Sequence, residues 1–400
     1  MSLPLQKPTL LYWLALLLSS QALLFYGLPW GALLTIWILL VIGFLFAGGA
    51  QAFLTAASLA ACALLLNFAI YATGLERGIY YRPQELLSAH DPDFGGIYRP
   101  NTQLSMNTLF GDLEAMGKAG VKEPHETIYR TDSLGFRNPA EYHGQQFVLV
   151  GDSFAAGAND TQSCLLTEWL RQDHKIDTYN LGFPGDMNDY VNRSKAFQQR
   201  HGHDFKTALF VFEGNDFIPY TGRTLPQPGM IERYYNLFKS TSLWRYTRSL
   251  YKRSSKKRGK HEGDALVQEI GGQKMVFFRQ YVAVTNNRTV LEENTLHFVP
   301  ALQALKPNIT QIFFIPTKYR VYAQWLSGEP LPNEQWQYLQ HAAQQAGVPV
   351  HDLTPVLQAE AVRLLPQGQY VYWRDDTHWN CNGMRVAATE VARVLSSHQP

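Results

Sequence analysis

Four residues suited to acyl transfer each follow a predicted strand or turn of this chain: Ser153, Gly185, Asn215 and His378. A serine nucleophile needs a base to take its proton, a group to orient that base, and donors that stabilise the oxyanion. The carboxyl ends of parallel strands meet at one edge of a sheet. We therefore predict that these four residues lie together at such an edge.

His378 is the best candidate for the base because it lies in Asp375-Asp376-Thr377-His378, at the end of a predicted strand and just before the last helix. Asp375, three residues earlier, is predicted to orient the imidazole, and Asp376 is the close competitor for that role. The predicted oxyanion donors are the backbone N–H groups of Ser153 and Gly185 and the side chain of Asn215. Each motif alone is equally well explained as an ordinary turn or helix cap.

The segments that must position these residues alternate between strands and helices. Buried strands are predicted at 147–150, 177–181, 207–212, 309–316 and 348–353. Helices are predicted at 188–199, 333–346 and 384–395, and a further one begins after Ser153 and ends near Arg171. This alternation predicts a mostly parallel sheet with helices on both faces.

We place the boundaries of this domain at residues 141 and 400. Within it, residues from about 217 to 308 interrupt the alternation and are interpreted as an insertion. It is predicted to be helical, to cover the carboxyl edge of the sheet, and to carry a basic loop at 245–261. We expect a solvated loop without a partner, and binding to anionic lipid headgroups or an anionic glycan is the alternative. Residues 76–140 are predicted to form an approach segment, an ordered loop over one end of the sheet.

The N-terminal 75 residues contain three apolar segments, at about 9–26, 31–48 and 51–73. The one charged side chain in these 75 residues is Lys7. Each is about long enough to cross a bilayer, so we predict a transmembrane anchor of three helices. A cleaved signal peptide and a buried helical hairpin are the alternatives. Lys7 precedes the first segment, which favours a cytoplasmic N-terminus and an external domain.

Charge and cysteine usage narrow the classes of function. The net charge of +2 gives no reason to expect a nucleic-acid partner. The sequence contains neither a CxxC motif nor a pair of histidines four residues apart, so it gives no sign of a metal site. Cys164 follows Ser153 by eleven residues and Cys381 follows His378 by three. If Ser153 and His378 meet, these two cysteines would be neighbours that could pair in an oxidising compartment.

The four motifs resemble the sequence blocks of the SGNH (GDSL-like) hydrolase superfamily, which contribute Ser, Gly, Asn and His in that order. The matching sequences are GDSF from Gly151, NLGFPG ending at Gly185, GND from Gly214 and DDTHWN from Asp375. The resemblance implies a flavodoxin-like αβα sandwich, the site residues given above, and neither cofactor nor metal. Glu213 stands where the family usually has a glycine, two places before the asparagine.

IPTKYRVY, from Ile315 to Tyr322, and YWRDDTHWN resemble the alginate-type O-acetyltransferase branch of this superfamily, which modifies exported polysaccharides. In that branch the Asp-His block precedes the serine, whereas here it follows, so only the substrate class carries over. Lys318 and Tyr322 become candidate substrate contacts, with a solvated loop as the alternative.

Together these patterns predict a membrane-anchored serine esterase or O-acyltransferase that acts on O-acyl, principally O-acetyl, groups of envelope or exported polysaccharide. The expected location is the bacterial inner membrane, with the catalytic domain periplasmic or extracellular. Expected partners are an acylated glycan or other ester, the lipid bilayer and a multi-span membrane acyltransferase. The alternatives are a lipid esterase and a non-catalytic SGNH-like scaffold that assists a membrane acyltransferase.

Overall fold

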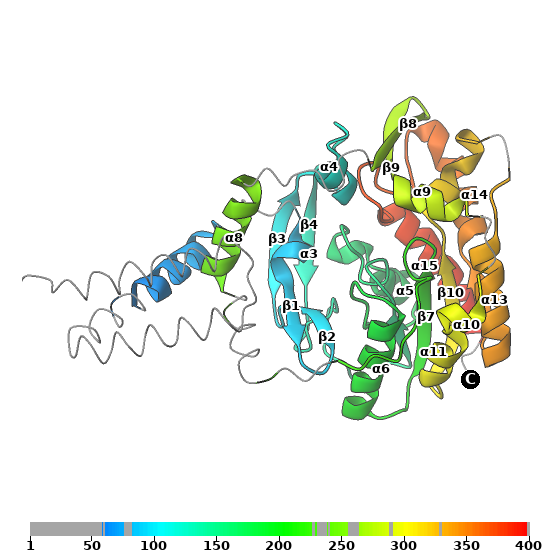
Figure 1. Cartoon of the computed structure of the whole chain (residues 1–400), viewed down its shortest axis with the longest axis horizontal. Coiled ribbons are helices and arrows are strands. Elements are labelled where there is room, and N and C mark those ends of the chain that lie inside the picture. The colour runs from blue at the N-terminus through cyan, green and yellow to red at the C-terminus, as the bar shows by residue number, and fades with distance from the viewer. Residues whose placement is uncertain are drawn as a thin grey trace, which may run out of the picture. The chain divides into compact units, whose positions relative to one another are not determined.

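The computed structural model describes residues 58, 61–75, 82–225, 229, 238, 241–254, 264–287, 291–327 and 330–397. The chain divides into two units, one made of residues 1–79 with 237–255 and the other of residues 80–236 with 256–400. Figure 1 shows the elements of both. All of the predicted site residues belong to the second unit.

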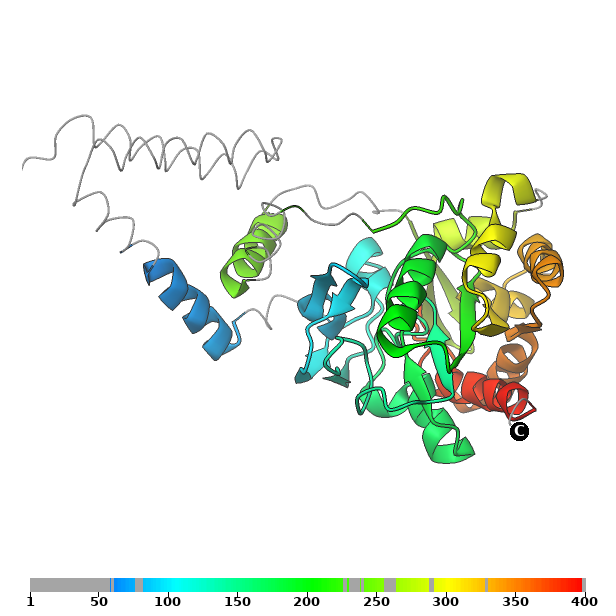
Figure 2. The ribbon, with the colours of Figure 1, turned by 90° about the horizontal axis from the view of Figure 1, so that it is seen from below.

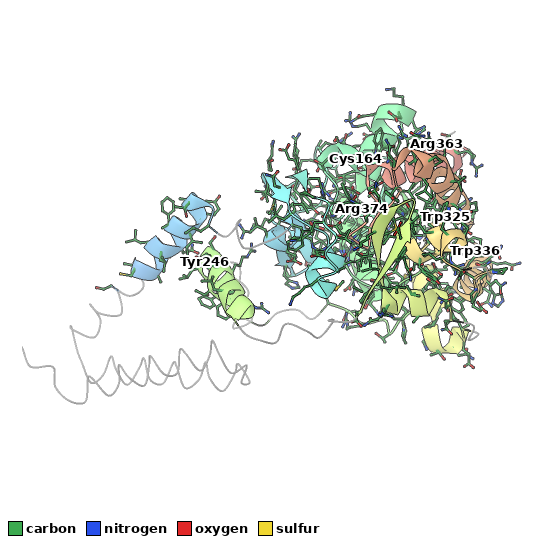
Figure 3. All side chains as sticks on the ribbon, turned by 90° about the horizontal axis from the view of Figure 1, so that it is seen from above. Cys164, Tyr246, Trp325, Trp336, Arg363 and Arg374 are labelled. Carbon is green, nitrogen blue, oxygen red and sulfur yellow. A yellow bond between two sulfur atoms is a disulfide. The ribbon has the colours of Figure 1, made fainter. Side chains whose placement is uncertain are left out.

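The first unit contains a helix at 61–73 and helix α8, Ser242–Ser254, which carries Tyr246 (Figure 3). The N–H of Leu243 donates to Oδ1 of Asn67 at 3.0 Å, so the start of α8 lies against the 61–73 helix. The predicted spans 9–26 and 31–48, and residues 51–57, 59 and 60 of the third span, lie outside the described residues. Within the described part of the chain, no helix is both long enough and apolar enough to cross a membrane.

The second unit is built on a parallel sheet that, in the described residues, has five strands in the order β11-β10-β7-β5-β6. The strands are β5 Phe147–Val150, β6 Thr178–Asn180, β7 Lys206–Phe212, β10 Ile309–Ile315 and β11 Val350–Asp352. All five predicted strands are confirmed. Their apolar residues form continuous runs because both faces of the sheet are covered.

Two helical layers cover the sheet (Figures 1 and 2). Val148, Leu209 and Ile312 face a cluster with α6, α11 and α13, whereas Leu149, Phe210 and Phe313 face a cluster with α5, α14 and α15. Alternate residues of a strand point to opposite faces, so neighbours in sequence enter different cores. The helices are α5 Leu166–His174, α6 Met187–His201, α11 Phe298–Ala304, α13 Glu334–Ala346, α14 Thr354–Leu364 and α15 Cys381–Ser396. The α/β fold with a parallel sheet is confirmed.

Two predicted elements next to the site are wrong. Residues 153–159 form turns instead of a helix, and α5 begins only at Leu166, after a short 3-10 turn at Gln162–Cys164. Gly157 and Asn159 both adopt a left-handed backbone, with φ of 67°, which a continuous helix excludes. The segment before the histidine forms a single bridge between Tyr372 and Trp379 and no strand of the sheet.

The approach segment is more regular than the predicted loop. It contains α3 Pro83–Leu87, β1 Ser88–Asp91, β2 Gly95–Tyr98, β3 Gln103–Thr108, α4 Asp112–Gly117 and β4 His125–Arg130. β1 pairs with β2 and β3 pairs with β4, both antiparallel. One face of β3 and β4 is exposed and mostly polar, so these strands lack the apolar runs that revealed the main sheet.

The insertion was predicted to be helical, and this is wrong for its middle part. β8 Ala265–Ile270 and β9 Gln273–Phe278 form an antiparallel hairpin, followed by α9 Arg279–Thr285 and α10 Glu293–Leu296. Gly271 and Gly272 form its turn with φ of 58° and 77°, as a two-residue hairpin turn requires. The N–H of Val276 in β9 donates to the carbonyl of Arg374 at 2.8 Å, so the hairpin supports the loop that carries His378. Of the basic run 245–261, residues 255–261 lie outside the described residues.

Glu213, at the position where the resemblance predicts glycine, forms a buried ion pair with Arg320. Nε of Arg320 donates to the carboxylate at 2.8 Å, and the N–H of Thr317 donates to it at 2.9 Å. We expect Arg320→Met to lower the free energy of unfolding by about 3–5 kcal/mol, because a buried carboxylate would lose its cation. Chemical denaturation measures this change.

Arg363→Met provides the matched control, because Arg363 pairs with Glu360 on the surface. Solvent screens an exposed pair of this kind, so its loss is expected to change the stability little. Equal losses for the two variants would contradict a structural role for the Glu213–Arg320 pair.

Candidate active site

Ser153, His378 and Asp376 form a continuous hydrogen-bonded chain. Nε2 of His378 lies 2.7 Å from Oγ of Ser153, and Nδ1 lies 2.6 Å from Oδ1 of Asp376. His378 and Asp376 are buried, while Ser153 is half-buried. The geometry is that of a nucleophile, its base and the carboxylate that orients the base.

The prediction that Asp375 orients His378 is wrong, and the competitor Asp376 has this position. Oδ2 of Asp375 instead accepts the N–H groups of Gly111 at 2.8 Å and Glu123 at 2.9 Å. Oδ1 of Asp376 accepts the backbone N–H of His378 at 3.0 Å as well as Nδ1. The turn from Asp376 to the backbone N–H of His378 brings the Asp376 oxygen to the imidazole ring. The carboxylate of Asp375 points to the approach segment instead.

The electrostatics of the pair favour a protonated imidazole beside a carboxylate. Burial alone would lower the pKa of His378, but the charge and hydrogen bond of Asp376 outweigh it and raise that pKa. Burial alone would raise the pKa of Asp376, yet the His378 partner holds it well below its usual range. The site therefore stabilises the imidazolium that forms when the base takes a proton.

The three predicted oxyanion donors remain predictions, and the structure places them as follows. In the described residues, the backbone N–H groups of Ser153 and Gly185 make no hydrogen bond. A Cβ at Gly185 would lie 2.7 Å from Oδ2 of Asp189 and 2.8 Å from a guanidinium nitrogen of Arg193, so only glycine fits there. Asn215 is exposed, and its side chain makes no hydrogen bond with the described residues.

The loop around Asn215 is fixed by its neighbour Asp216. The carboxylate of Asp216 accepts the N–H of Phe212 and the hydroxyl of Tyr190, both at 2.7 Å. Asp216 is buried, and burial together with the charge of Asp152 raises its pKa well above the usual range. These contacts hold the end of β7 and leave the Asn215 amide available to a substrate.

The approach segment supports the site through contacts that the sequence did not reveal. The His125 ring stacks on Trp373 with centroids 3.9 Å apart, and its Nε2 lies 2.8 Å from the carbonyl of Asn159. Glu123 pairs with Arg374 at 2.6 Å (Arg374 is labelled in Figure 3). The segment thus connects the loop that follows Ser153 with the loop that carries His378.

Lys318 and Tyr322, predicted as candidate substrate contacts, are buried behind the His378 loop in α12, Lys318–Tyr322. Nζ of Lys318 donates to the carbonyls of Asp376 at 2.7 Å and Trp373 at 3.0 Å, and burial lowers its pKa to about 8. The Tyr322 hydroxyl accepts the N–H of Val371 at 3.0 Å. The prediction is wrong, because both side chains have structural partners.

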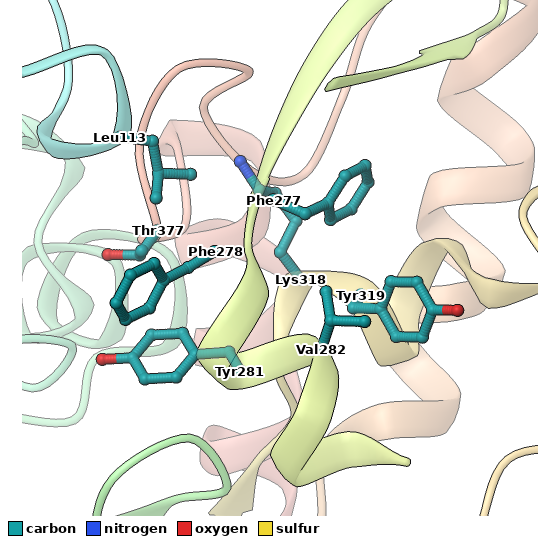
Figure 4. A pocket seen from close by; sticks show the side chains of 8 residues that line it. All are labelled: Leu113, Phe277, Phe278, Tyr281, Val282, Lys318, Tyr319 and Thr377. Atoms are coloured by element: carbon teal, nitrogen blue, oxygen red, sulfur yellow. The ribbon is translucent and has the colours of Figure 1, made fainter. Parts of the chain in front are cut away.

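A small cavity lies beside this loop, and Figure 4 shows the eight side chains that line it. Lys318 extends across it toward the loop of Thr377, and Phe278 and Tyr281 from the insertion form one wall. Tyr281 also packs edge-on against Phe212 at the end of β7, with centroids 5.2 Å apart. The insertion therefore contacts both the His378 loop and the strand that precedes Asn215.

Cys164 and Cys381 form a disulfide with a Cα–Cα distance of 5.0 Å, which confirms the hypothesis that they are neighbours (Cys164 is labelled in Figure 3). Cys164 ends the 3-10 turn after the Ser153 loop, and Cys381 begins α15 just after His378. The bond links the segment of the nucleophile to the segment of the base.

The structure places a serine, a histidine and an aspartate together at the carboxyl edge of a parallel sheet. Residues 276–400 match the family model described as "SGNH hydrolase-like domain, acetyltransferase AlgX", which confirms the resemblance to this superfamily and to its AlgX-type branch. The matched range contains Asp376 and His378 and begins after Ser153, Gly185 and Asn215.

The other two comparisons add little. No curated protein matches the chain. One solved crystal structure aligns with 14% sequence identity over 63% of this chain and 95% of that chain, at a TM-score of 0.30. That similarity is too low to support an argument about fold or function.

Proposed function

We propose that this protein is an SGNH-type serine esterase or O-acyltransferase that acts on O-acyl, principally O-acetyl, groups of envelope or exported polysaccharide. The observation that carries the proposal is the chain from Ser153 through His378 to Asp376, with contacts of 2.7 and 2.6 Å. The family match to an acetyltransferase domain supports the acyl group and the substrate class.

The proposed mechanism has two half-reactions. Oγ of Ser153 attacks the acyl carbonyl while Nε2 of His378 takes its proton, and Asp376 holds the imidazolium through Nδ1. The N–H groups of Ser153 and Gly185 and the amide of Asn215 stabilise the oxyanion. The ester bond then breaks, and the leaving sugar oxygen receives the proton from His378. Water or a second sugar hydroxyl, deprotonated by His378, finally attacks the acyl-enzyme and regenerates the Ser153 hydroxyl.

The proposal includes a membrane anchor in the bacterial inner membrane with the catalytic unit on the periplasmic or extracellular side. Three apolar segments precede the catalytic unit, and the described helix at 61–73 exposes large apolar side chains, with Leu64 71% and Phe68 66% exposed. Large exposed apolar surfaces favour a lipid or protein partner. The Cys164–Cys381 disulfide supports an oxidising compartment. Proposed partners are the acylated glycan, the bilayer and a multi-span acyltransferase that supplies acyl groups.

The test uses the full chain in detergent or nanodiscs and a fluorophosphonate probe. We expect the probe to form a covalent adduct, and peptide mass spectrometry to place that adduct on Ser153. In a second assay, an acetyl ester donor is supplied with and without a polysaccharide acceptor, and acetate and acetylated glycan are both quantified. Acetylated glycan indicates a transferase, and acetate alone indicates an esterase.

Two outcomes would contradict the proposal. Absence of any adduct on Ser153 in folded protein would favour the non-catalytic scaffold that assists another acyltransferase. A strong preference for long-chain lipid esters over acetyl esters would favour the lipid esterase. In either case the glycan O-acetyl assignment fails.

A further inference from the structure

We propose that Asp112 and Arg82, both from the approach segment, are positioning residues that tune the basicity of His378 in opposite directions. The inference rests on the proposed function, because it assigns His378 the role of general base. It adds two residues that lie outside the four sequence blocks and outside the range matched by the family model.

Asp112 reaches His378 through the hydroxyl of Thr377. Oδ1 of Asp112 accepts the N–H of Thr377 at 2.9 Å, and Oδ2 accepts its hydroxyl at 2.7 Å. The Thr377 oxygen lies 3.2 Å from Nδ1 of His378, and Oδ2 of Asp112 lies 3.9 Å from the same nitrogen. Because the threonine proton is directed to Asp112, its oxygen faces Nδ1–H as a second and longer acceptor beside Asp376.

Arg82 lies close to both carboxylates. One of its guanidinium nitrogens is 3.6 Å from Oδ2 of Asp376 and 3.7 Å from Oδ2 of Asp112. The N–H of Asp112 also donates to Oδ2 of Asp376 at 2.7 Å, which ties α4 to the His378 loop. Asp112, Asp376 and His378 have the composition of a metal site, but here the cation beside the two carboxylates is Arg82.

The charges of this cluster explain the tuning. With a neutral His378, one guanidinium and two carboxylates leave a net negative charge, and protonation of the imidazole neutralises it. Asp112 therefore favours the imidazolium, and Arg82 disfavours it. Burial and the charge of Asp376 raise the pKa of Asp112, and the opposing effects of Arg82, His378 and the Thr377 hydrogen bond only partly offset that rise. The carboxylate of Asp112 accepts two hydrogen bonds from Thr377, as an ionised carboxylate does, because it has no proton to donate.

Other charged groups near His378 have partners of their own and stay in place when Asp112 or Arg82 is replaced. They come from the strand end before Ser153, from α12, from the His378 loop and from the approach segment: Asp152, Lys318, Asp375 and Glu123. Their effect on the imidazole is therefore common to wild type and both variants. Differences between the titration curves report Asp112 and Arg82, the latter together with the exposed Glu85 that pairs with it at 3.3 Å.

The experiment measures the rate of fluorophosphonate labelling of Ser153 against pH for wild type, Asp112→Asn and Arg82→Gln. The base acts only when neutral, so the rate rises as pH passes the His378 pKa. Loss of the Asp112 charge is expected to move this rise to lower pH by about one unit, a tenfold change in the protonation constant. Loss of the Arg82 charge is expected to move it to higher pH by a similar amount.

An activity-independent readout comes from NMR titration of the His378 ring nitrogens, which should show the same two opposite shifts. Asp93→Asn and Arg130→Gln, exposed residues of the same segment, are the matched controls and should leave both curves unmoved. If Asp112→Asn fails to fold, Arg82→Gln and Asp112→Glu still test the proposal, with Asp112→Glu expected to keep the wild-type curve.

Unmoved curves, or two shifts in the same direction, would overturn the tuning proposal while leaving Ser153 labelling intact. Failure of the proposed function is distinguishable from this, since wild-type protein would then lack labelling at every pH. The NMR titration would decide the electrostatic question even then.

Discussion

Ser153→Ala is expected to lower kcat/KM for ester substrates by a factor on the order of 10⁴–10⁶, with little change in stability. In the proposed mechanism, Oγ of Ser153 forms the bond to the acyl group. In the alanine variant, a water molecule would have to attack the ester directly, without a fixed position. The hydroxyl contacts His378 at 2.7 Å, and its removal leaves the imidazole paired with Asp376. Initial rates with an acetyl ester, together with circular dichroism, measure both effects.

Ser105→Ala is the matched control, since Ser105 is exposed on β3, where its hydroxyl donates to Glu126. Its kinetics should equal those of wild type. A Ser153→Ala protein that keeps more than about a tenth of the wild-type rate would rule out Ser153 as nucleophile.

Asp376→Asn is expected to lower kcat by about 10⁴ because the amide no longer enforces the tautomer in which Nδ1 carries the proton. Oδ1 of Asp376 accepts the hydrogen bond from Nδ1 at 2.6 Å and is itself buried, so no water can replace the carboxylate. The substrate does not contact Asp376, and KM should change far less than kcat. Steady-state kinetics separate the two parameters.

Asp375→Asn distinguishes the two adjacent carboxylates. Asp375 binds the N–H groups of Gly111 and Glu123 and does not touch the His378 ring. Its replacement is expected to weaken the attachment of the loop and to lower kcat by less than about tenfold, because the tautomer is still set by Asp376. A larger effect at Asp375 than at Asp376 would contradict the geometry described above.

The sheet could be predicted from the sequence because its strands are buried on both faces and are therefore apolar throughout, as in Phe147–Val150. The same strands end in Ser153, Gly185 and Asn215, so their common edge followed from parallel order alone. The fold of the second unit and the common edge of Ser153, Gly185 and Asn215 could therefore be predicted from the sequence, whereas the strand expected before His378 is only a single bridge.

The rest depended on contacts between distant segments or on local geometry that residue type does not reveal. Asp375 and Asp376 are chemically identical neighbours, and only the turn from Asp376 to the N–H of His378 decides between them. Asp112 has no spacing relation to His378, since 264 residues separate it from its partner Asp376. The hairpin at Gly271-Gly272, by contrast, carried a recognisable turn signal within a segment predicted to be helical.

The contacts of Gly111 and Asp112 with Asp375 and Asp376 also have a consequence for the order of folding. Each of these hydrogen bonds spans 264 residues, and the Ser153–His378 contact spans 225. Contacts of such high sequence separation form late, because the chain entropy lost in closing the loop is recovered only after the intervening core is packed. During synthesis, the nucleophile and the approach segment therefore emerge without a base. A chain that lacks its last 25 residues has neither Asp376 nor His378, so Ser153 gains its histidine partner only after the C-terminal segment docks.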